Sequence, residues 1–242
     1  MNLVFDIGNT RTKVFVFDRD HPIADVTFQS LGIPGLSKII SKYPVGECIL
    51  SSVTKHSAAI TNFLAKNTRL IVLNHTTALP IRNRYKSKET LGNDRIANAV
   101  GASKIFPLRN CLVIDIGTCI KYDYINKGTE YLGGAISPGL QMRYKSLHDY
   151  TAKLPLIKPA NKTSLTGTNT TESIVSGVQQ GMLSEMEGCI NLYKKKYRTL
   201  KVIVTGGDAN RFAHLFNFPI FAAPYLTATG LNEILQYNHA KK

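Results

Sequence analysis

Two short segments of the chain carry nearly the same side chains in the same order. LVFDIGNT occupies residues 3–10, and LVIDIGTC occupies residues 112–119. In each segment an apolar, strand-like run ends in an aspartate, a glycine follows two positions later, and polar side chains come next. Glycine permits a turn with positive φ and lets backbone N–H groups approach an anion closely. Each segment could therefore hold a phosphate group.

The aspartate of each segment cannot bind phosphate directly. Asp6 and Asp115 make sense beside phosphates if a divalent cation, or its water shell, lies between the two negative groups. Asn9, Thr10 and Thr12 add neutral donors for phosphate oxygens. A single D-x-G-x-T is most often a plain hairpin turn, but two copies in matched surroundings favour a nucleoside triphosphate site that is split between two halves of the chain.

The hydrophobic patterns around the two segments predict a duplicated α/β chain. In the first half we expect strands at 2–7, 13–18, 21–28, 48–53 and 69–73, with helices from 34 and at 57–67, in the order βββαβαβ. In the second half we expect strands at 111–117, 121–126, 130–137 and 201–205, with helices at 139–149, 170–196 and 226–238. The turn at 107–110 then separates two domains, residues 1–108 and 109–242, with a cleft between them.

Composition limits the classes of protein to consider. Hydrophobic residues make up 43% and charged residues 19%, which is ordinary for a globular protein. No apolar run is long enough for a membrane helix, and the N-terminus lacks the features of a secretory signal, so we expect a cytoplasmic protein without membrane contact. The four cysteines form no C-x-x-C pair, which favours free thiols.

The net charge of +14 invites a nucleic-acid partner. The basic residues are scattered, however, and the densest runs are short: NRYKSK at 83–88 and YKKKYR at 193–198. The second run is typical of a helix C-terminus, where cations interact favourably with the helix dipole. We therefore expect a general attraction for phosphate-bearing ligands and no dedicated nucleic-acid surface.

Further motifs follow the two segments in a characteristic order. They are GNDR (92–95), GGAISPGL (133–140), TAKLP (151–155), NTTESIVSG (169–177) and TGGD (205–208), with DIGNTRTK (6–13) and DIGTCIKYD (115–123) at the segments themselves. Taken together, the motifs identify the chain as similar to type III pantothenate kinases, within the superfamily of acetate kinase, sugar kinases, Hsp70 and actin. The resemblance covers essentially the whole chain and implies two duplicated ribonuclease H-like, actin-like α/β domains.

The resemblance also implies a function. It implies ATP-dependent phosphorylation of pantothenate to 4′-phosphopantothenate, the first step of coenzyme A biosynthesis. It further implies a homodimer that uses Mg²⁺ and a monovalent cation, either K⁺ or NH₄⁺. Two alternatives keep the fold: a transcription accessory or nucleic-acid-associated protein, and a kinase of another small hydroxy acid.

Site residues follow from the positions that match the family. Asp94 matches the catalytic base, although a helix N-cap is the simpler role for it. Asp115 matches the ligand of the monovalent cation. The residues that match pantothenate-binding positions are Tyr85, Gly92, Asn93, Asp94, Arg95 and Thr170. The residues that match ATP and phosphate contacts are Asp6, Ile7, Gly8, Asn9, Thr10, Arg11, Thr12, Lys13 and Thr118.

Two positions depart from the family pattern. Asn93 stands where an alanine is usual, between Gly92 and Asp94. Lys121 stands two residues before Asp123, where a threonine is usual. Lys121 could contact phosphate or point to solvent, and we expect it to point to solvent.

Overall fold

The structure is a computed structural model that describes residues 1–8, 11–29, 32–52 and 57–240. The chain folds into two compact units. The first contains Met1–Pro107, Thr129–Tyr131 and the segment from Tyr225 onward, and the second contains Leu108–Gly128 and Leu132–Pro224.

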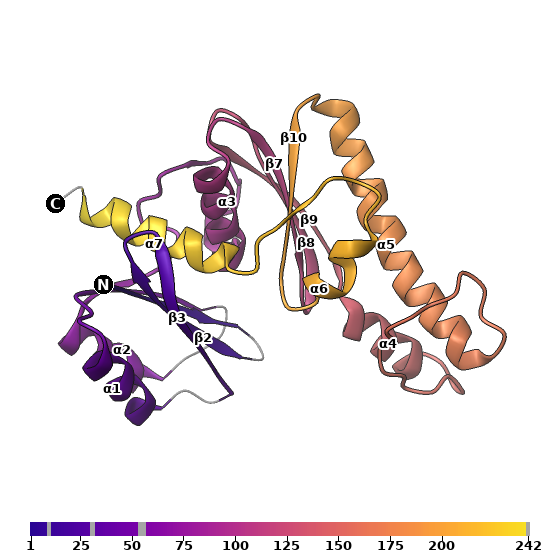
Figure 1. Ribbon diagram of the computed structural model, residues 1–242, viewed down its shortest axis with the longest axis horizontal. Coiled ribbons are helices and arrows are strands. Elements are labelled where there is room, and N and C mark those ends of the chain that lie inside the picture. Colours follow the sequence, from indigo (N-terminus) through magenta and orange to yellow (C-terminus); the bar gives the residue numbers. More distant parts are fainter. Residues whose placement is uncertain (9–10, 30–31, 53–56, 241–242) are drawn as a thin grey trace. The chain divides into compact units, whose positions relative to one another are not determined.

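The first unit is built on a five-stranded sheet of order β3-β2-β1-β4-β5 (Figure 1). Its strands are β1 (Asn2–Ile7), β2 (Thr12–Asp18), β3 (His21–Phe28), β4 (Glu47–Ser52) and β5 (Arg69–Val72). The first three strands are antiparallel neighbours, while β1, β4 and β5 run parallel. Parallel neighbours need crossover connections, which α1 (Ile33–Lys42) and α2 (Ala58–Asn67) supply. The expected βββαβαβ order is confirmed.

Strand periodicity fills one face of this sheet with apolar side chains. The side chains of alternate β1 residues form a hydrophobic core with side chains of α1 and α2. This core includes Leu3, Phe5, Ile7, Leu36, Ile39, Ile60 and Leu64. Complete burial of such a side chain contributes about 1.5–3 kcal/mol. Because side chains alternate along a strand, Asp6 lies on the face away from this core.

The C-terminal helix completes the first unit. In this unit α7 (Leu226–His239) packs on α3 (Asn93–Ile105) and contacts β1 and β4. The two helices approach closely at two glycines: a Cβ atom at Gly230 would lie 1.8 Å from the carbonyl oxygen of Ala97, and one at Gly101 would lie 2.5 Å from that of Leu226. The chain divides between Pro107 and Leu108, next to the expected boundary, but the segment from Tyr225 onward belongs to the first unit, because the helix partner of α7 lies in the first half.

The second unit repeats the same topology. Its sheet contains the order β11-β10-β7-β8-β9, which is the counterpart of β5-β4-β1-β2-β3 in the first sheet. The strands β11, β10 and β7 run parallel, and β7 and β8 are antiparallel. The strands are β7 (Asn110–Ile116), β8 (Cys119–Ile125), β9 (Glu130–Pro138), β10 (Leu200–Thr205) and β11 (Phe221–Ala222). Within the first unit, β6 (Arg82–Asn83) pairs with the start of β9. The sequence patterns did not indicate β6 and β11, since two residues carry no periodicity.

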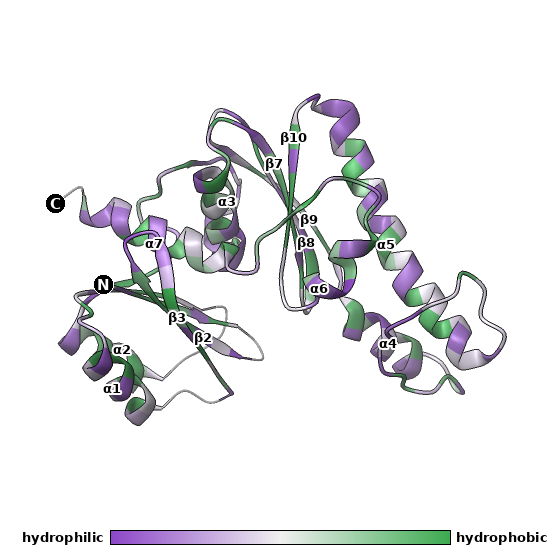
Figure 2. Cartoon of the chain, in the orientation of Figure 1, coloured by the Kyte–Doolittle hydropathy of each residue, from purple (hydrophilic) through white to green (hydrophobic). Residues whose placement is uncertain are grey.

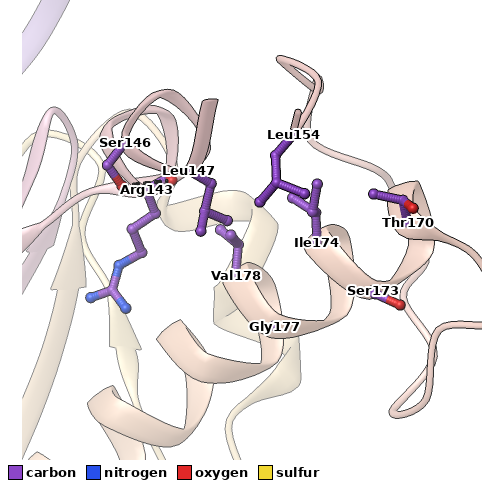
Figure 3. A pocket seen from close by; sticks show the side chains of 9 residues that line it. All are labelled: Arg143, Ser146, Leu147, Leu154, Thr170, Ser173, Ile174, Gly177 and Val178. Atoms are coloured by element: carbon purple, nitrogen blue, oxygen red, sulfur yellow. Dashed lines mark hydrogen bonds between the residues drawn. The ribbon is translucent and has the colours of Figure 1, made fainter. Parts of the chain in front are cut away.

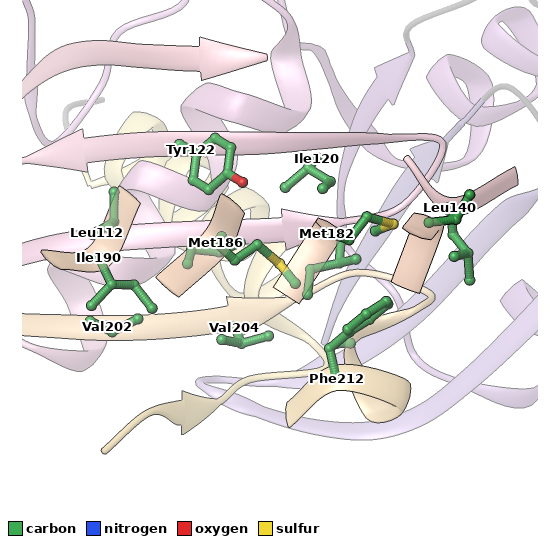
Figure 4. Packing of buried hydrophobic residues seen from close by; sticks show 14 of the residues in the cluster. Leu112, Ile120, Tyr122, Leu140, Met182, Met186, Ile190, Val202, Val204 and Phe212 are labelled. Carbon is green, nitrogen blue, oxygen red and sulfur yellow. The ribbon is translucent and has the colours of Figure 1, made fainter. Parts of the chain in front are cut away.

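Helices cover one face of the second sheet. They are α4 (Leu140–Asp149), α5 (Thr170–Lys196) and α6 (Ala209–Phe212), followed by the short 3₁₀ helix η2 (Ala213–Leu215). Figure 4 shows the packing of α5, through Met182, Met186 and Ile190, against apolar side chains of β7, β8 and β10. Figure 2 shows hydrophobic and hydrophilic residues interspersed along α5, as its one-sided burial requires.

The ends of α5 agree with helix-capping chemistry. The side chain of Asn169 caps the N-terminus by accepting a hydrogen bond of 3.0 Å from the backbone N–H of Glu172. Three lysines, Lys194 to Lys196, occupy the last turn, where the helix dipole favours cations. The expected helix at 170–196 is confirmed, because both of its ends carry strong sequence signals.

An ionic network joins α4, α5 and β8. Arg143 forms a salt bridge with Glu185, and the hydroxyl of Tyr122 donates a 2.8 Å hydrogen bond to the same carboxylate. Burial by itself would raise the pKa of Glu185, but the hydrogen bonds from Arg143, Tyr122 and Ser137 and the charge of Arg143 outweigh it, so the pKa lies below its usual range. The network therefore stabilises the ionised carboxylate.

None of the helices in the described segments is long and apolar enough to cross a membrane. All four cysteines are free thiols, with Cys48 and Cys111 buried.

The helix pair of the first unit generates a stability prediction. We expect Gly230→Ala to destabilise the protein by about 1–3 kcal/mol, since the added methyl group would overlap backbone atoms of α3. Gly188→Ala is the matched control on α5, where a Cβ atom meets nothing within 4 Å. It should stabilise the protein by about 0.5–1 kcal/mol. Urea denaturation checks both changes, and equal effects would contradict the close approach of α3 and α7.

The ionic network generates a pH prediction. A carboxylate with a lowered folded-state pKa contributes stability that is present above its unfolded pKa, about 4.3, and is lost as pH falls through the folded value. Glu185→Gln should therefore lower the melting temperature at pH 7, and the difference from the unmodified protein should shrink below about pH 4. Glu89→Gln, on the surface of η1 (Lys88–Thr90), is the control for loss of one negative charge. A difference that is constant with pH would contradict the network's role.

Candidate active site

The hairpin between β1 and β2 carries most of the expected phosphate contacts. Asp6 and Ile7, at the end of β1, pair with Lys13 and Thr12 at the start of β2. The backbone N–H of Gly8 donates a 3.0 Å hydrogen bond to the carbonyl of Arg11, which closes the turn. Asn9 and Thr10 lie outside the described residues. Ile7 is 7% exposed and belongs to the core, so only its backbone is placed to meet a ligand.

The hairpin between β7 and β8 differs from the first in one important contact. Asp115 lies directly opposite Lys121 in the antiparallel register, and the Lys121 Nζ is 2.8 Å from the Asp115 Oδ2. The two side chains are only 17% and 11% exposed. The expectation that Lys121 points to solvent is therefore wrong. The physical reason is register, because directly opposite residues of an antiparallel pair project from the same face and come close together.

The ion pair affects whether Asp115 can bind the monovalent cation that the resemblance implies for it. The carboxylate already has a cationic partner in hydrogen-bond contact. A second cation about 4 Å from that ammonium would be repelled by about 4 kcal/mol at an effective dielectric of about 20, which cancels the attraction by the single carboxylate at the same distance. The residues at this position therefore do not fit an additional monovalent cation.

Two glycines let other backbone segments approach the second hairpin. Gly206 of the TGGD motif has φ +101°, and a Cβ atom there would lie 2.5 Å from Asp115 Oδ1. A Cβ atom at Gly139, the N-cap of α4, would lie 2.4 Å from the carbonyl oxygen of Thr118. Thr118 itself is exposed at the turn. Sequence reasoning noted both glycine motifs but missed these two contacts, because only the fold shows what each glycine faces.

Asp94 lies in the first turn of α3, in the first unit. The N-cap of this helix is Gly92, and Asp94 accepts a 2.9 Å hydrogen bond from the backbone N–H of Arg95. Asp94 is therefore not the N-cap that the sequence suggested as its simpler role. A Cβ atom at Gly92 would lie 2.6 Å from Asp94 Oδ1, so the glycine makes room for the carboxylate. The positive end of the helix dipole stabilises a negative charge here.

The departure at residue 93 has a structural explanation. The Asn93 side-chain amide donates to the carbonyl oxygen of Leu73 at 3.0 Å and to that of Ser52 at 3.4 Å. These bonds tie the start of α3 to the ends of β4 and β5. A cavity of about 320 Å³ adjoins the same helix start, and its lining includes Gly92, Asn93 and His75.

Arg95 and Tyr85 lie together in the first unit. The Arg95 side chain is 5% exposed, and its guanidinium lies over the Tyr85 ring, 5.6 Å from the ring centroid. A buried guanidinium on an aromatic face is held by cation–π attraction. A side chain this deeply buried is not part of a surface salt bridge.

Thr170 belongs to the second unit. It is the first residue of α5, directly after the Asn169 cap. It lines a cavity of about 710 Å³ between α4 and α5, together with Arg143, Leu147, Leu154 and Ile174 (Figure 3). Figure 3 shows an apolar centre formed by the leucine and isoleucine side chains, with Thr170 at one end and Arg143 at the other. The other expected pantothenate residues lie in the first unit.

Solved structures share the fold. A conserved protein of Campylobacter jejuni, described as a Baf family transcriptional activator, matches with a TM-score of 0.63 and 22% identity over 98% of this chain and 99% of that one. The inorganic polyphosphate/ATP-glucomannokinase of an Arthrobacter strain matches with a TM-score of 0.50 and 13% identity over the full length of both chains. The expected actin-like fold of two ribonuclease H-like domains is confirmed.

Sequence relatives identify the family. A type III pantothenate kinase of Christiangramia forsetii is 41% identical over 240 residues, which cover 98% of this chain and 99% of the relative. The family model of type III pantothenate kinase matches residues 2–192. The chain therefore belongs to the type III pantothenate kinase family.

Proposed function

We propose that this chain phosphorylates pantothenate with Asp94 as the general base. Family membership supplies the reaction, which is ATP-dependent phosphorylation of pantothenate to 4′-phosphopantothenate, the first step of coenzyme A biosynthesis. The observation that carries the residue assignment is the position of the Asp94 carboxylate. It lies in the first turn of α3, fixed by the Arg95 N–H and by the space at Gly92.

The proposed step is a single displacement at the γ-phosphorus of ATP. The primary hydroxyl oxygen of pantothenate attacks the γ-phosphorus of ATP, the bond from that phosphorus to the β,γ-bridging oxygen breaks, and ADP leaves. The hydroxyl proton passes to the Asp94 carboxylate. Phosphoryl transfer depends mainly on alignment and charge neutralisation, so Asp94 orients the hydroxyl as well as accepting its proton.

Arg95 and Tyr85 are the proposed contacts of the pantothenate chain. The substrate carries a carboxylate, and a guanidinium can meet it with two parallel hydrogen bonds. The Tyr85 ring, which already packs on Arg95, offers an apolar surface with a polar tip. Gly92, Asn93 and Thr170 complete the proposed pantothenate-binding set, with the amide of Asn93 also anchoring the helix start.

The first hairpin and Thr118 are the proposed contacts of ATP. A divalent metal ion accompanies ATP in this family, and we propose Mg²⁺. The described residues contain no group of three or more His, Cys, Asp or Glu side chains that could hold a metal ion. Mg²⁺ bound to substrate phosphates needs only one or two carboxylates, and Asp6 at the end of β1 fits that need. The ion would neutralise phosphate charge.

Assembly and location are also part of the proposal. The family resemblance supports a homodimer acting in the cytoplasm. Sedimentation equilibrium of the purified chain tests the dimer, and a monomer at micromolar concentration would contradict it.

The two alternative functions differ in what supports them. A kinase of another small hydroxy acid would keep the mechanism and change only the substrate contacts. A nucleic-acid-associated role is supported by the net charge of +14, whereas the match to the Campylobacter jejuni protein, at 22% identity, concerns the fold alone. A screen of pantothenate, pantetheine and simple sugars with ATP and Mg²⁺ separates the kinases, and salt-sensitive DNA binding at micromolar protein with a sequence preference would favour the other role.

The base assignment makes a direct prediction. Asp94→Asn should reduce kcat about 10²–10⁴-fold, because the amide cannot accept the hydroxyl proton, while ATP affinity stays the same. Asp18→Asn, which changes an exposed carboxylate at the end of β2, is the matched control and should retain activity. Product formation by mass spectrometry and ATP binding by calorimetry provide the measurements. Full turnover by the Asp94 variant would rule out this base.

The space at Gly92 makes a second prediction. In Gly92→Ala the added methyl group would lie 2.6 Å from Asp94 Oδ1, so the carboxylate must move. We expect about a tenfold or greater loss of kcat with little change in melting temperature. Gly46→Ala, where a Cβ atom meets nothing within 4 Å, is the control in the same unit. Unchanged kcat in the Gly92 variant would show that the position of Asp94 does not matter.

A further inference from the structure

The carboxylate of Asp115 has close neighbours at both of its oxygens. Oδ2 is 2.8 Å from the Lys121 ammonium. Oδ1 lies where a Cβ atom at Gly206 would come within 2.5 Å, so the backbone of the TGGD turn is packed against it. Asp115 is 8% exposed as a residue, which makes this a largely buried ion pair.

The position of Lys121 is set by the strand that carries it. Its neighbours in β8, Ile120 and Tyr122, both enter the hydrophobic core of the second unit. Because side chains alternate along a strand, Lys121 must project from the opposite face. On that face the register places it directly opposite Asp115. Its ammonium is therefore held at the carboxylate by the same packing that holds the strand.

We propose that the Lys121 ammonium serves as a built-in monovalent cation at Asp115, so that catalysis by this chain does not depend on K⁺ or NH₄⁺. The inference rests on the proposed function and on the match of Asp115 to the cation-binding position of the family. A primary ammonium is chemically a tethered ammonium ion: it carries one positive charge and donates N–H groups to a carboxylate. A tethered cation is present at every ionic composition, whereas a free ion must bind.

The first hairpin offers a competing role for Lys121. Lys13 lies opposite Asp6 in the same relation as Lys121 to Asp115, and Lys13 is a proposed phosphate contact. If Lys121 acted in the same way, its loss would weaken ATP binding, and no added cation would restore it. The two roles therefore differ in their response to K⁺.

The main experiment measures formation of 4′-phosphopantothenate with ATP and Mg²⁺ in a sodium buffer free of K⁺ and NH₄⁺, followed by titration with KCl. The unmodified protein should be fully active without K⁺ and gain nothing from it. Lys121→Thr should lose about tenfold in kcat without K⁺, because Asp115 loses the cation that lies 2.8 Å from its Oδ2. K⁺ or NH₄⁺ should restore its activity in a saturable manner.

A matched control separates this effect from the loss of any paired lysine. Lys145 forms an exposed ion pair with Asp149 on α4, 2.7 Å from Nζ to Oδ2. Lys145→Thr should behave like the unmodified protein at every K⁺ concentration. A rise in activity of the unmodified protein on adding K⁺ would overturn the inference. So would a Lys121 variant whose KM for ATP rises without rescue by K⁺.

A second measurement does not depend on turnover. The melting temperature of Lys121→Thr, without nucleotide, should be higher in KCl than in NaCl, while that of the unmodified protein should be the same in both salts. If the unmodified protein makes no product in any salt, the proposed function fails, and the melting comparison still decides the cation question. If the variant does not fold, the activity of the unmodified protein with and without K⁺ still shows whether catalysis depends on K⁺.

Discussion

The register of one hairpin in each unit determines what chemistry the chain can support. In both hairpins an aspartate at the end of the first strand lies directly opposite a lysine on the second, Asp6 with Lys13 and Asp115 with Lys121. A slip of one residue would turn the aspartate toward the hydrophobic core and an isoleucine or leucine toward the polar face. The apolar residues at alternate positions of β1 and β7 oppose such a slip. The core thus fixes the position of the charged groups.

The second constraint is the close packing of backbone segments against one another. In both units this packing is possible because glycine has no side chain. Gly101 and Gly230 bring α3 and α7 together, so the last helix of the chain completes the first unit. Gly206 and Gly139 bring two further segments against the second hairpin. In each case a side chain would occupy the space that a neighbouring carbonyl or carboxylate fills. Glycine therefore permits both the packing of the two helices and the close contacts around the polar groups at the strand ends.

At the start of α3, the charged groups of two consecutive residues point in different directions. Asp94 and Arg95 are consecutive, yet the carboxylate turns back to the backbone N–H at the helix start while the guanidinium enters the interior over Tyr85. Asn93 ties this helix start to the ends of β4 and β5. A proposed base and a proposed carboxylate-binding group therefore sit on one rigid element. Rigid support of this kind is what alignment-dependent catalysis requires.

The sequence by itself determined the types and order of the longer elements and the duplication, because strand alternation, helix caps and the repeated octapeptide are local signals. It also singled out the Asp6, Asp94 and Asp115 positions, since the motifs around them are contiguous in the chain. Only the tertiary structure decided that α7 belongs to the first unit, that Asn93 anchors a helix and that Lys121 meets Asp115. Those facts depend on which distant atoms come within a few ångströms. No local pattern encodes that proximity, because it results from the packing of the whole unit.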